Sequence, residues 1–73
     1  MRRTGDVVDT AQGLLVCRAD GEVEIGTLVI DDSLDPVGRI VDVFGPVERP
    51  YFAVTPHDDV HPPRLVGERL YAR

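Results

Sequence analysis

The sequence predicts a small all-β domain in which six strands over residues 1–73 close into a barrel. Turn-forming residues recur every eight to twelve residues and separate short runs rich in Val, Ile, Leu and Tyr. No apolar stripe has the spacing of a helix, so the rhythm is typical of small barrels and sandwiches. Closure is favoured over an open sheet because it removes unpaired edges.

The strands are expected, in chain order, at residues 5–10, 14–19, 27–30, 37–44, 51–55 and 65–71. Each gap holds residues typical of turns: Gln12-Gly13, Asp20-Gly21, residues 31–36, Gly45-Pro46 and residues 56–63. A glycine stands at or near the start of four strands: Gly5, Gly26, Gly38 and Gly67. Such glycines mark the corners of a small barrel, with ordinary loop glycines as the alternative.

The fourth expected strand carries apolar residues on both faces. In strict alternation, Val41 and Val43 lie on one face, and Ile40 and Phe44 lie on the other. A strand with this pattern is covered on both sides. One side fills the barrel, and no helix is expected to cover the other, so part of the outer face is expected to meet another protein. Weak self-association of the free chain is a further expectation.

Length and composition indicate a single domain of the soluble, cytoplasmic class. A chain of 73 residues buries roughly 60% of the surface that its unfolded form exposes, which leaves a thin core. Cys17 is the one cysteine, so no disulfide forms within the chain. The N-terminus lacks the apolar stretch of a signal peptide, and the longest aliphatic run, Leu14–Val16, is far too short to span a membrane.

The charge is acidic and unevenly distributed. The formal net charge is −5, with eight Arg, no Lys and nine Asp among thirteen acidic residues. Residues 5–48 carry ten acidic residues against Arg18 and Arg39, a net of −8. Most of this surface repels nucleic acid, whose phosphates supply most of the non-specific affinity. The acidity is explained either by solubility or by adaptation to a salty cytoplasm. The absence of Lys has a further explanation, because a GC-rich genome also replaces Lys with Arg.

No residue pattern supports catalysis, a metal or a cofactor. His57 and His61 flank two aspartates, but prolines 56, 62 and 63 prevent a helix that would align the two imidazoles. A solvated loop is the preferred interpretation, with a metal site as the alternative. Cys17 beside a histidine would suit a nucleophile, but it follows Val16 in an apolar strand and is expected to be buried.

The stretch Asp42–Tyr51 (DVFGPVERPY) is stiffer than a hairpin turn requires, because two prolines fix the backbone on either side of its tip. Pre-ordering of this kind favours binding to a partner, and Phe and Tyr are common interface anchors. The candidate binding residues are Val43, Phe44, Gly45, Pro46, Val47, Pro50 and Tyr51. We predict that Val43, Phe44, Val47 and Tyr51 form one apolar cluster. The alternative is that Phe44 turns inward and plugs the barrel.

The segments Ile25–Val37, Gly38–Val54 and Leu65–Tyr71 resemble the Gar-type core subunit of H/ACA ribonucleoproteins, in its short archaeal form. The similarity runs from about Thr4 to Tyr71, and Asp42–Val47 followed by Pro50-Tyr51 is its most specific element. The resemblance implies a six-stranded barrel related to domains of translation factors. The glycine/arginine-rich tails of eukaryotic members are absent from this sequence.

The resemblance also implies a function within the machinery for RNA-guided pseudouridine synthesis. A Gar-type subunit is not the catalyst. It docks on the catalytic domain of the dyskerin-type pseudouridine synthase, away from the guide RNA, and helps substrate loading and product release in rRNA modification and ribosome biogenesis. The alternative from the residues alone is a small barrel that binds RNA directly.

Overall fold

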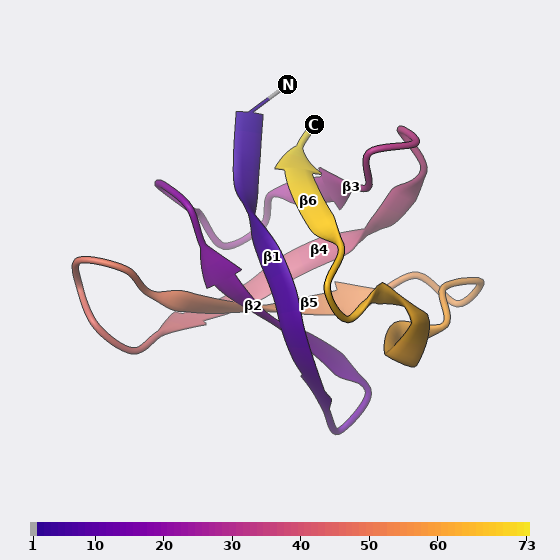
Figure 1. The fold of residues 1–73 in the computed structure, drawn as a ribbon, viewed down its shortest axis with the longest axis horizontal. Helices are drawn as coiled ribbons and strands as arrows, with labels where there is room; N and C mark the ends of the chain where they lie inside the picture. Colours follow the sequence, from indigo (N-terminus) through magenta and orange to yellow (C-terminus); the bar gives the residue numbers. More distant parts are fainter. Residues whose placement is uncertain (1) are drawn as a thin grey trace.

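Six strands and one short 3-10 helix make up the computed structural model, which describes residues 2–73 (Figure 1). In chain order the elements are β1 (Arg2–Ala11), β2 (Leu14–Ala19), β3 (Leu28–Ile30), β4 (Pro36–Phe44), β5 (Tyr51–Pro56), η1 (Pro62–Leu65) and β6 (Arg69–Ala72). The strands β2, β3, β4 and β5 begin within about one residue of their predicted starts, and β1 begins somewhat earlier than expected. Only β6 departs further, as described below.

The strands form a closed barrel in the order β1-β2-β5-β4-β3-β6, and every pairing is antiparallel. This confirms the predicted architecture. β1 pairs with β2 on one side and with β6 on the other, so Arg2 lies opposite Ala72 and the first and last strands lie side by side (Figure 1). Because β5 lies between β2 and β4, the hairpin that joins β4 to β5 projects near the end of β2.

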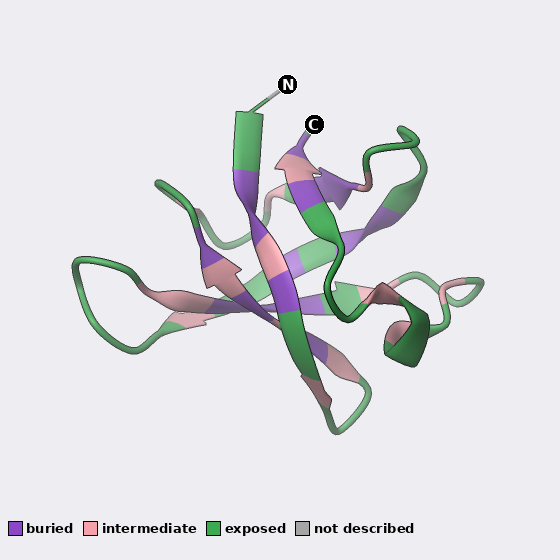
Figure 2. Ribbon diagram, in the orientation of Figure 1, coloured by how far each residue is buried: buried purple, intermediate pink, exposed green. Residues whose placement is uncertain are grey.

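All six strands carry buried residues (Figure 2), and their apolar side chains fill the barrel interior. The largest fully buried side chains are those of Phe52, Leu15, Ile40 and Leu70. Phe52 on β5 is therefore the aromatic residue that fills the barrel. Phe44 keeps 42% of its surface exposed, so the alternative in which Phe44 plugs the barrel is wrong.

A β-bulge explains much of the two-faced apolar pattern on β4. The pairing with β5 shifts register between Ile40 and Asp42, which inserts Val41 as an extra residue. Ile40 is buried and Val43 packs against the core, although strict alternation would place them on opposite faces. A register shift between Val7 and Asp9 has the same effect on β1. The bulges leave Val41 and Val8 on the exterior.

The four glycines play two different roles. Gly5 and Gly38 lie within strands, and a Cβ at either position would clash with a neighbouring carbonyl oxygen, of Arg18 and Thr55 respectively. These two fit the predicted close approach at barrel corners. The same interpretation is wrong for Gly26 and Gly67, which lie in turns outside the strands with φ of 96° and 94°. They are loop glycines that supply a left-handed conformation.

The predicted start of the last strand is wrong. Residues 62–65 form η1 instead, and β6 begins at Arg69. Two consecutive prolines at the start of η1 have their φ fixed near the helical value, which favours this turn. Leu65 packs against the core from η1. No helix among residues 2–73 is long and apolar enough to cross a membrane.

Candidate docking surface

The candidate binding residues surround one exposed hairpin. β4 ends at Phe44, Gly45 takes a φ of +90°, and β5 begins at Tyr51. A positive φ is accessible to glycine without a steric penalty, and Pro46 and Pro50 then restrict the rest of the loop. Val47 at the tip is 94% exposed. The hairpin therefore presents an apolar tip that nothing in the barrel covers.

The predicted apolar cluster is divided between two surfaces. Val43 and Phe44 are consecutive residues in a strand, so their side chains point to opposite faces. Val43 packs toward the core, and it lines a cleft together with Val47 and Pro50. Phe44 instead lies on the outer face, where its ring stacks on that of Tyr51 at 5.8 Å between centroids.

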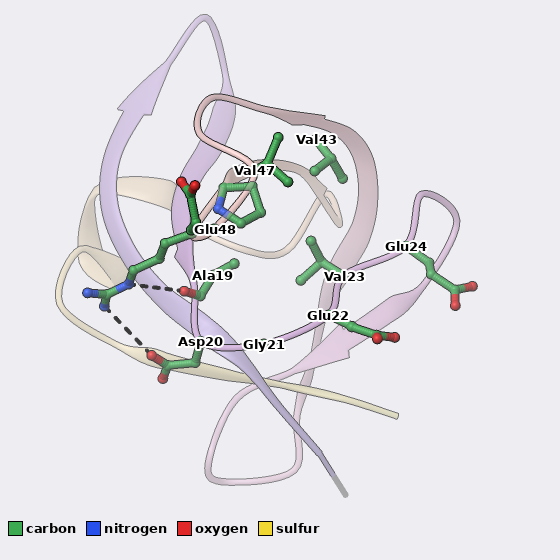
Figure 3. A pocket seen from close by; sticks show the side chains of 11 residues that line it. Ala19, Asp20, Gly21, Glu22, Val23, Glu24, Val43, Val47 and Glu48 are labelled. Atoms are coloured by element: carbon green, nitrogen blue, oxygen red, sulfur yellow. Dashed lines mark hydrogen bonds and ion pairs between the residues drawn. The ribbon is translucent and has the colours of Figure 1, made fainter.

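The cleft lies between the hairpin and the segment that follows β2. It has a volume of about 610 Å³ and is open to solvent. In Figure 3 the side chains of Val23, Val43 and Val47 point toward one another, while Glu22 and Glu24 point out on one side. The eleven lining residues are Ala19, Asp20, Gly21, Glu22, Val23, Glu24, Val43, Val47, Glu48, Arg49 and Pro50.

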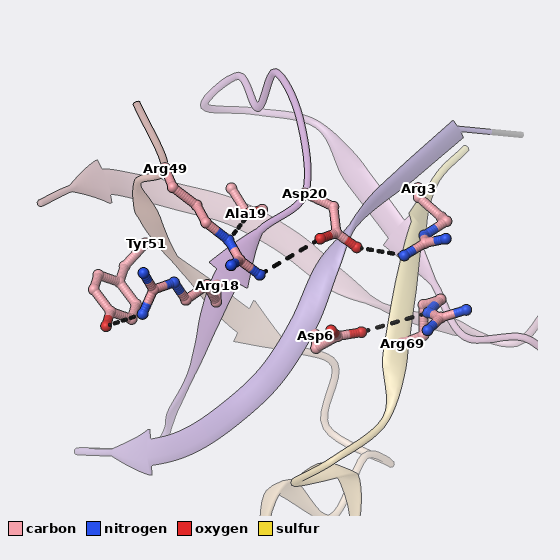
Figure 4. Close-up of polar contacts among 8 residues, drawn as sticks. All are labelled: Arg3, Asp6, Arg18, Ala19, Asp20, Arg49, Tyr51 and Arg69. Atoms are coloured by element: carbon pink, nitrogen blue, oxygen red, sulfur yellow. Dashed lines mark hydrogen bonds and ion pairs between the residues drawn. The ribbon is translucent and has the colours of Figure 1, made fainter. Parts of the chain in front are cut away.

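A small polar network closes the opposite side of the cleft. Asp20 accepts a hydrogen bond from Arg3 at 2.8 Å and lies 3.8 Å from an Arg49 guanidinium nitrogen (Figure 4). Arg49 also donates from Nε to the carbonyl oxygen of Ala19 at 3.3 Å. The hydrogen bond from Arg3 and the charges of both arginines hold the pKa of Asp20 below its usual value. The network ties the tip of the hairpin to the end of β2.

On the outer face, one row of side chains crosses five strands. The register aligns Phe44, Tyr51, Arg18, Asp6 and Arg69 across β4, β5, β2, β1 and β6. Arg18 lies over the Tyr51 ring at 5.0 Å and donates from Nη1 to its hydroxyl at 2.9 Å. Arg69 donates to Asp6 at 3.5 Å (Figure 4). The exposed ring of Phe44 and the half-buried ring of Tyr51 are thus held against the barrel wall.

The sequence did not identify the residues that line the cleft but lie outside the hairpin. Val23, Glu22 and Glu24 follow β2, and only the pairing of β2 with β5 brings them to the hairpin. Arg18 was also missed, because its contact with Tyr51 depends on the same pairing. The one signal available was the Asp20-Gly21 turn, which places a polar segment directly after a strand.

The alternatives of a metal site and of a reactive cysteine concern the two histidines and Cys17. Among residues 2–73, no group of three His, Cys, Asp or Glu side chains could hold a metal ion. Cys17 is fully buried, and this burial, with the nearby Asp6 carboxylate, raises its pKa to about 12. A thiol in that state is a poor nucleophile, which agrees with the expectation that Cys17 is a buried residue of the barrel.

Two uncharacterized proteins are similar to this chain in sequence. An uncharacterized protein of Methanocaldococcus jannaschii is 40% identical over 47 residues, which span 64% of this chain and 57% of that protein. An uncharacterized protein of Methanothermobacter thermautotrophicus is 28% identical over 75 residues, which span 97% of this chain and 82% of the other.

The solved structure of the Gar1 domain of Naf1 has the same fold. It matches 99% of this chain and 83% of its own length with a TM-score of 0.76, at 15% sequence identity. The family model described as the Gar1/Naf1 RNA binding region matches residues 1–73. Because that match spans the whole sequence, the chain belongs to the Gar1/Naf1 RNA binding region family.

Proposed function

We propose that this chain is a non-catalytic protein subunit of the H/ACA RNA-guided pseudouridine synthase complex in the cytoplasm. In this proposal it docks on the catalytic domain of the dyskerin-type synthase and assists substrate loading and product release. It contacts the guide RNA only indirectly. Family membership and the barrel fold support the general assignment. The surface around the β4–β5 hairpin supports the docking step.

The observation that best supports docking is the exposure of apolar side chains on β4 and on the hairpin that follows it. Val41 and Phe44 are each 42% exposed, and Val47 is almost fully exposed. Apolar and aromatic residues held on a rigid scaffold are typical anchors at interface centres. The two prolines and the stacking of Phe44 on Tyr51 order this surface before a partner arrives, which lowers the entropic cost of binding.

Titration of the chain with purified dyskerin-type synthase, with and without guide RNA, tests the docking step. We expect binding without RNA, and we expect Val41→Asp and Val47→Asp each to weaken it, because a carboxylate would lie unpaired against an apolar partner. Val66→Asp is the matched control, since Val66 is also exposed but lies near β6, away from the hairpin. Equal weakening by all three variants, or no binding by the parent, would contradict the proposal.

The assisting role and the lack of catalysis need a separate measurement. Release of tritium from labelled uridine RNA should be absent with this chain alone. It should rise under multiple-turnover conditions when the chain is added to the synthase and guide RNA. Activity of the chain alone above a blank without protein would contradict the non-catalytic assignment. The same exposed apolar residues predict weak self-association of the free chain at high concentration, which Val47→Asp should reduce.

Direct RNA binding is the second candidate, and two observations favour it. The matching family carries RNA binding in its description. Phe44 is an exposed aromatic side chain of the kind on which bases stack, and it lies beside the half-buried Tyr51 and Arg18. The acidic surface opposes it. A mobility shift with naked guide RNA distinguishes the two candidates. Direct binding should appear at moderate salt, fall as salt rises, and weaken in Phe44→Ala.

A further inference from the structure

The cleft beside the hairpin has an apolar floor, formed by Val23 and Val43, and an acidic mouth, formed by Glu22 and Glu24. No basic side chain of the described residues neutralises the charge of this mouth. Val23 and Val43 pack against the core at its base, and Val47 stands exposed at its edge. Four carboxylates line the cleft against one guanidinium, that of Arg49. Such a surface can accept a side chain that is apolar along its length and cationic at its end.

The existing ion pairs leave the acidic mouth open. Arg49, the single basic residue of the lining, is held by Asp20 and by the carbonyl oxygen of Ala19 (Figure 4). Glu22, Glu24 and Glu48 have no Arg or His partner within 4.0 Å among residues 2–73. In Figure 3, Glu22 and Glu24 extend on the side away from Asp20, the partner of Arg49. Two unpaired carboxylates, those of Glu22 and Glu24, therefore lie on one side of the cleft.

This charge pattern selects one class of occupant. A nucleic acid or phosphate ligand would be repelled, because the one arginine is already engaged. A purely apolar peptide would bury the glutamates without partners, which is unfavourable. An arginine satisfies both parts, since its aliphatic stem packs on apolar surface while its guanidinium pairs with carboxylates.

We infer that the cleft receives a segment of the partner protein in which an arginine stands next to an aliphatic or aromatic residue. The apolar residue contacts Val23, Val43 and Val47, and the guanidinium pairs with Glu22 and Glu24. This inference rests on the proposed function in taking the dyskerin-type synthase as the partner. It adds that docking has an electrostatic component at the cleft, besides the apolar contacts of the outer face.

The test compares two double variants in titrations against the purified synthase. Glu22→Gln/Glu24→Gln removes the acidic mouth, and Asp32→Asn/Asp58→Asn removes the same charge at exposed positions elsewhere. We expect the cleft variant to bind about fivefold to tenfold more weakly at low salt, and its affinity to depend less on salt. The control variant should bind like the parent. Parental affinity and salt dependence in the cleft variant would overturn the inference while leaving the docking proposal intact.

A second measurement does not require the synthase. The peptide acetyl-Leu-Arg-Leu-amide at millimolar concentration should shift the backbone amide resonances of Gly21, Val23 and Val43 in the free chain. Acetyl-Leu-Glu-Leu-amide should not shift them, acetyl-Gly-Arg-Gly-amide should shift them less, and Glu22→Gln/Glu24→Gln should abolish the effect. Shifts confined to other residues, or equal shifts with the glutamate peptide, would overturn the inference. If the free chain binds the arginine peptide in the cleft but does not bind the synthase, the docking proposal is refuted instead.

Discussion

Arg18 and Tyr51 meet in two ways on the outer wall of the barrel. The guanidinium lies over the phenol ring at 5.0 Å, and its Nη1 donates a hydrogen bond to the hydroxyl at 2.9 Å. The two residues are paired directly across β2 and β5. Since Phe44 stacks on the same ring, this contact joins both aromatic residues of the hairpin to β2, a strand that is remote in sequence.

We expect Tyr51→Phe to lower the free energy of unfolding by about 0.5–1.5 kcal/mol, because it removes one hydrogen bond but keeps the ring under Arg18. Tyr51→Ala should cost more, since it also removes the stacking partner of Phe44. Urea denaturation of both variants separates the hydroxyl from the ring. Equal losses in the two variants would show that the ring contributes nothing beyond the hydroxyl.

Phe44→Ala and Phe52→Ala should behave oppositely. Phe44 is exposed and stacked, so its truncation should cost the fold only about 0.5–1.5 kcal/mol, but should weaken synthase binding about thirty-fold if it is an anchor. Phe52 is fully buried, so its truncation opens a cavity and should cost about 3–5 kcal/mol of folding stability. Denaturation curves and synthase titrations of both variants check this. Unfolding of the free Phe44→Ala chain, or its unchanged affinity, would remove Phe44 from the docking surface.

The barrel was predictable because its signals are local. Runs of Val, Leu and Tyr that end at Gly13, Gly45 and Pro50 indicate where the strands lie. A sheet of so few strands is better closed than open, which predicts a barrel. The start of β6 was missed because the leucine and valine at 65–66 look like strand, whereas the preceding prolines start a 3-10 turn. Register was also beyond local reasoning, since the bulge at Val41 changes which face each later residue occupies.

The candidate site was predictable only in its contiguous part. The hairpin residues are recognisable from their proline, glycine and aromatic chemistry within ten positions. The other wall of the cleft, with Val23 and Glu22, depends on β5 lying between β2 and β4. That order is a long-range pairing, and the residues themselves are an ordinary acidic loop in the sequence.

Glycine substitutions should distinguish the packed barrel corners from an open turn. Gly5→Ala and Gly38→Ala place a methyl group against the carbonyl oxygens of Arg18 and Thr55, and each should destabilise the barrel by about 3 kcal/mol. Gly21→Ala is the matched control, because a methyl group there would meet nothing within 4 Å beyond its chain neighbours, and it should change stability by less than about 1 kcal/mol. Thermal melts of the three variants give the comparison. Similar melting temperatures for all three would contradict the close approach of backbones at Gly5 and Gly38.

Cys17 should be protected from thiol reagents in the folded chain. Burial raises its pKa from 9.0 to about 12, so the folded state keeps the thiol protonated where the unfolded state ionises. The corresponding stability is fully present below about pH 9 and is lost as pH rises toward 12. Labelling with a disulfide reagent at pH 8 should follow the unfolded fraction, and Cys17→Ala should flatten the alkaline loss of stability. Rapid labelling under native conditions would contradict this burial.

Salt should stabilise the free chain. Residues 5–48 carry ten acidic residues against two arginines, and the ion pairs of the described chain engage only Asp20 and Asp6 among these carboxylates. Raising potassium chloride from 0.1 M to 1 M shortens the Debye length from about 10 Å to about 3 Å, which screens most of the remaining repulsion. We therefore expect the melting temperature to rise over this range, and to rise less in Glu22→Gln/Glu24→Gln/Asp32→Asn. If the melting temperature of the parent stays flat or falls, charge repulsion does not destabilise the fold, and the acidity serves solubility alone.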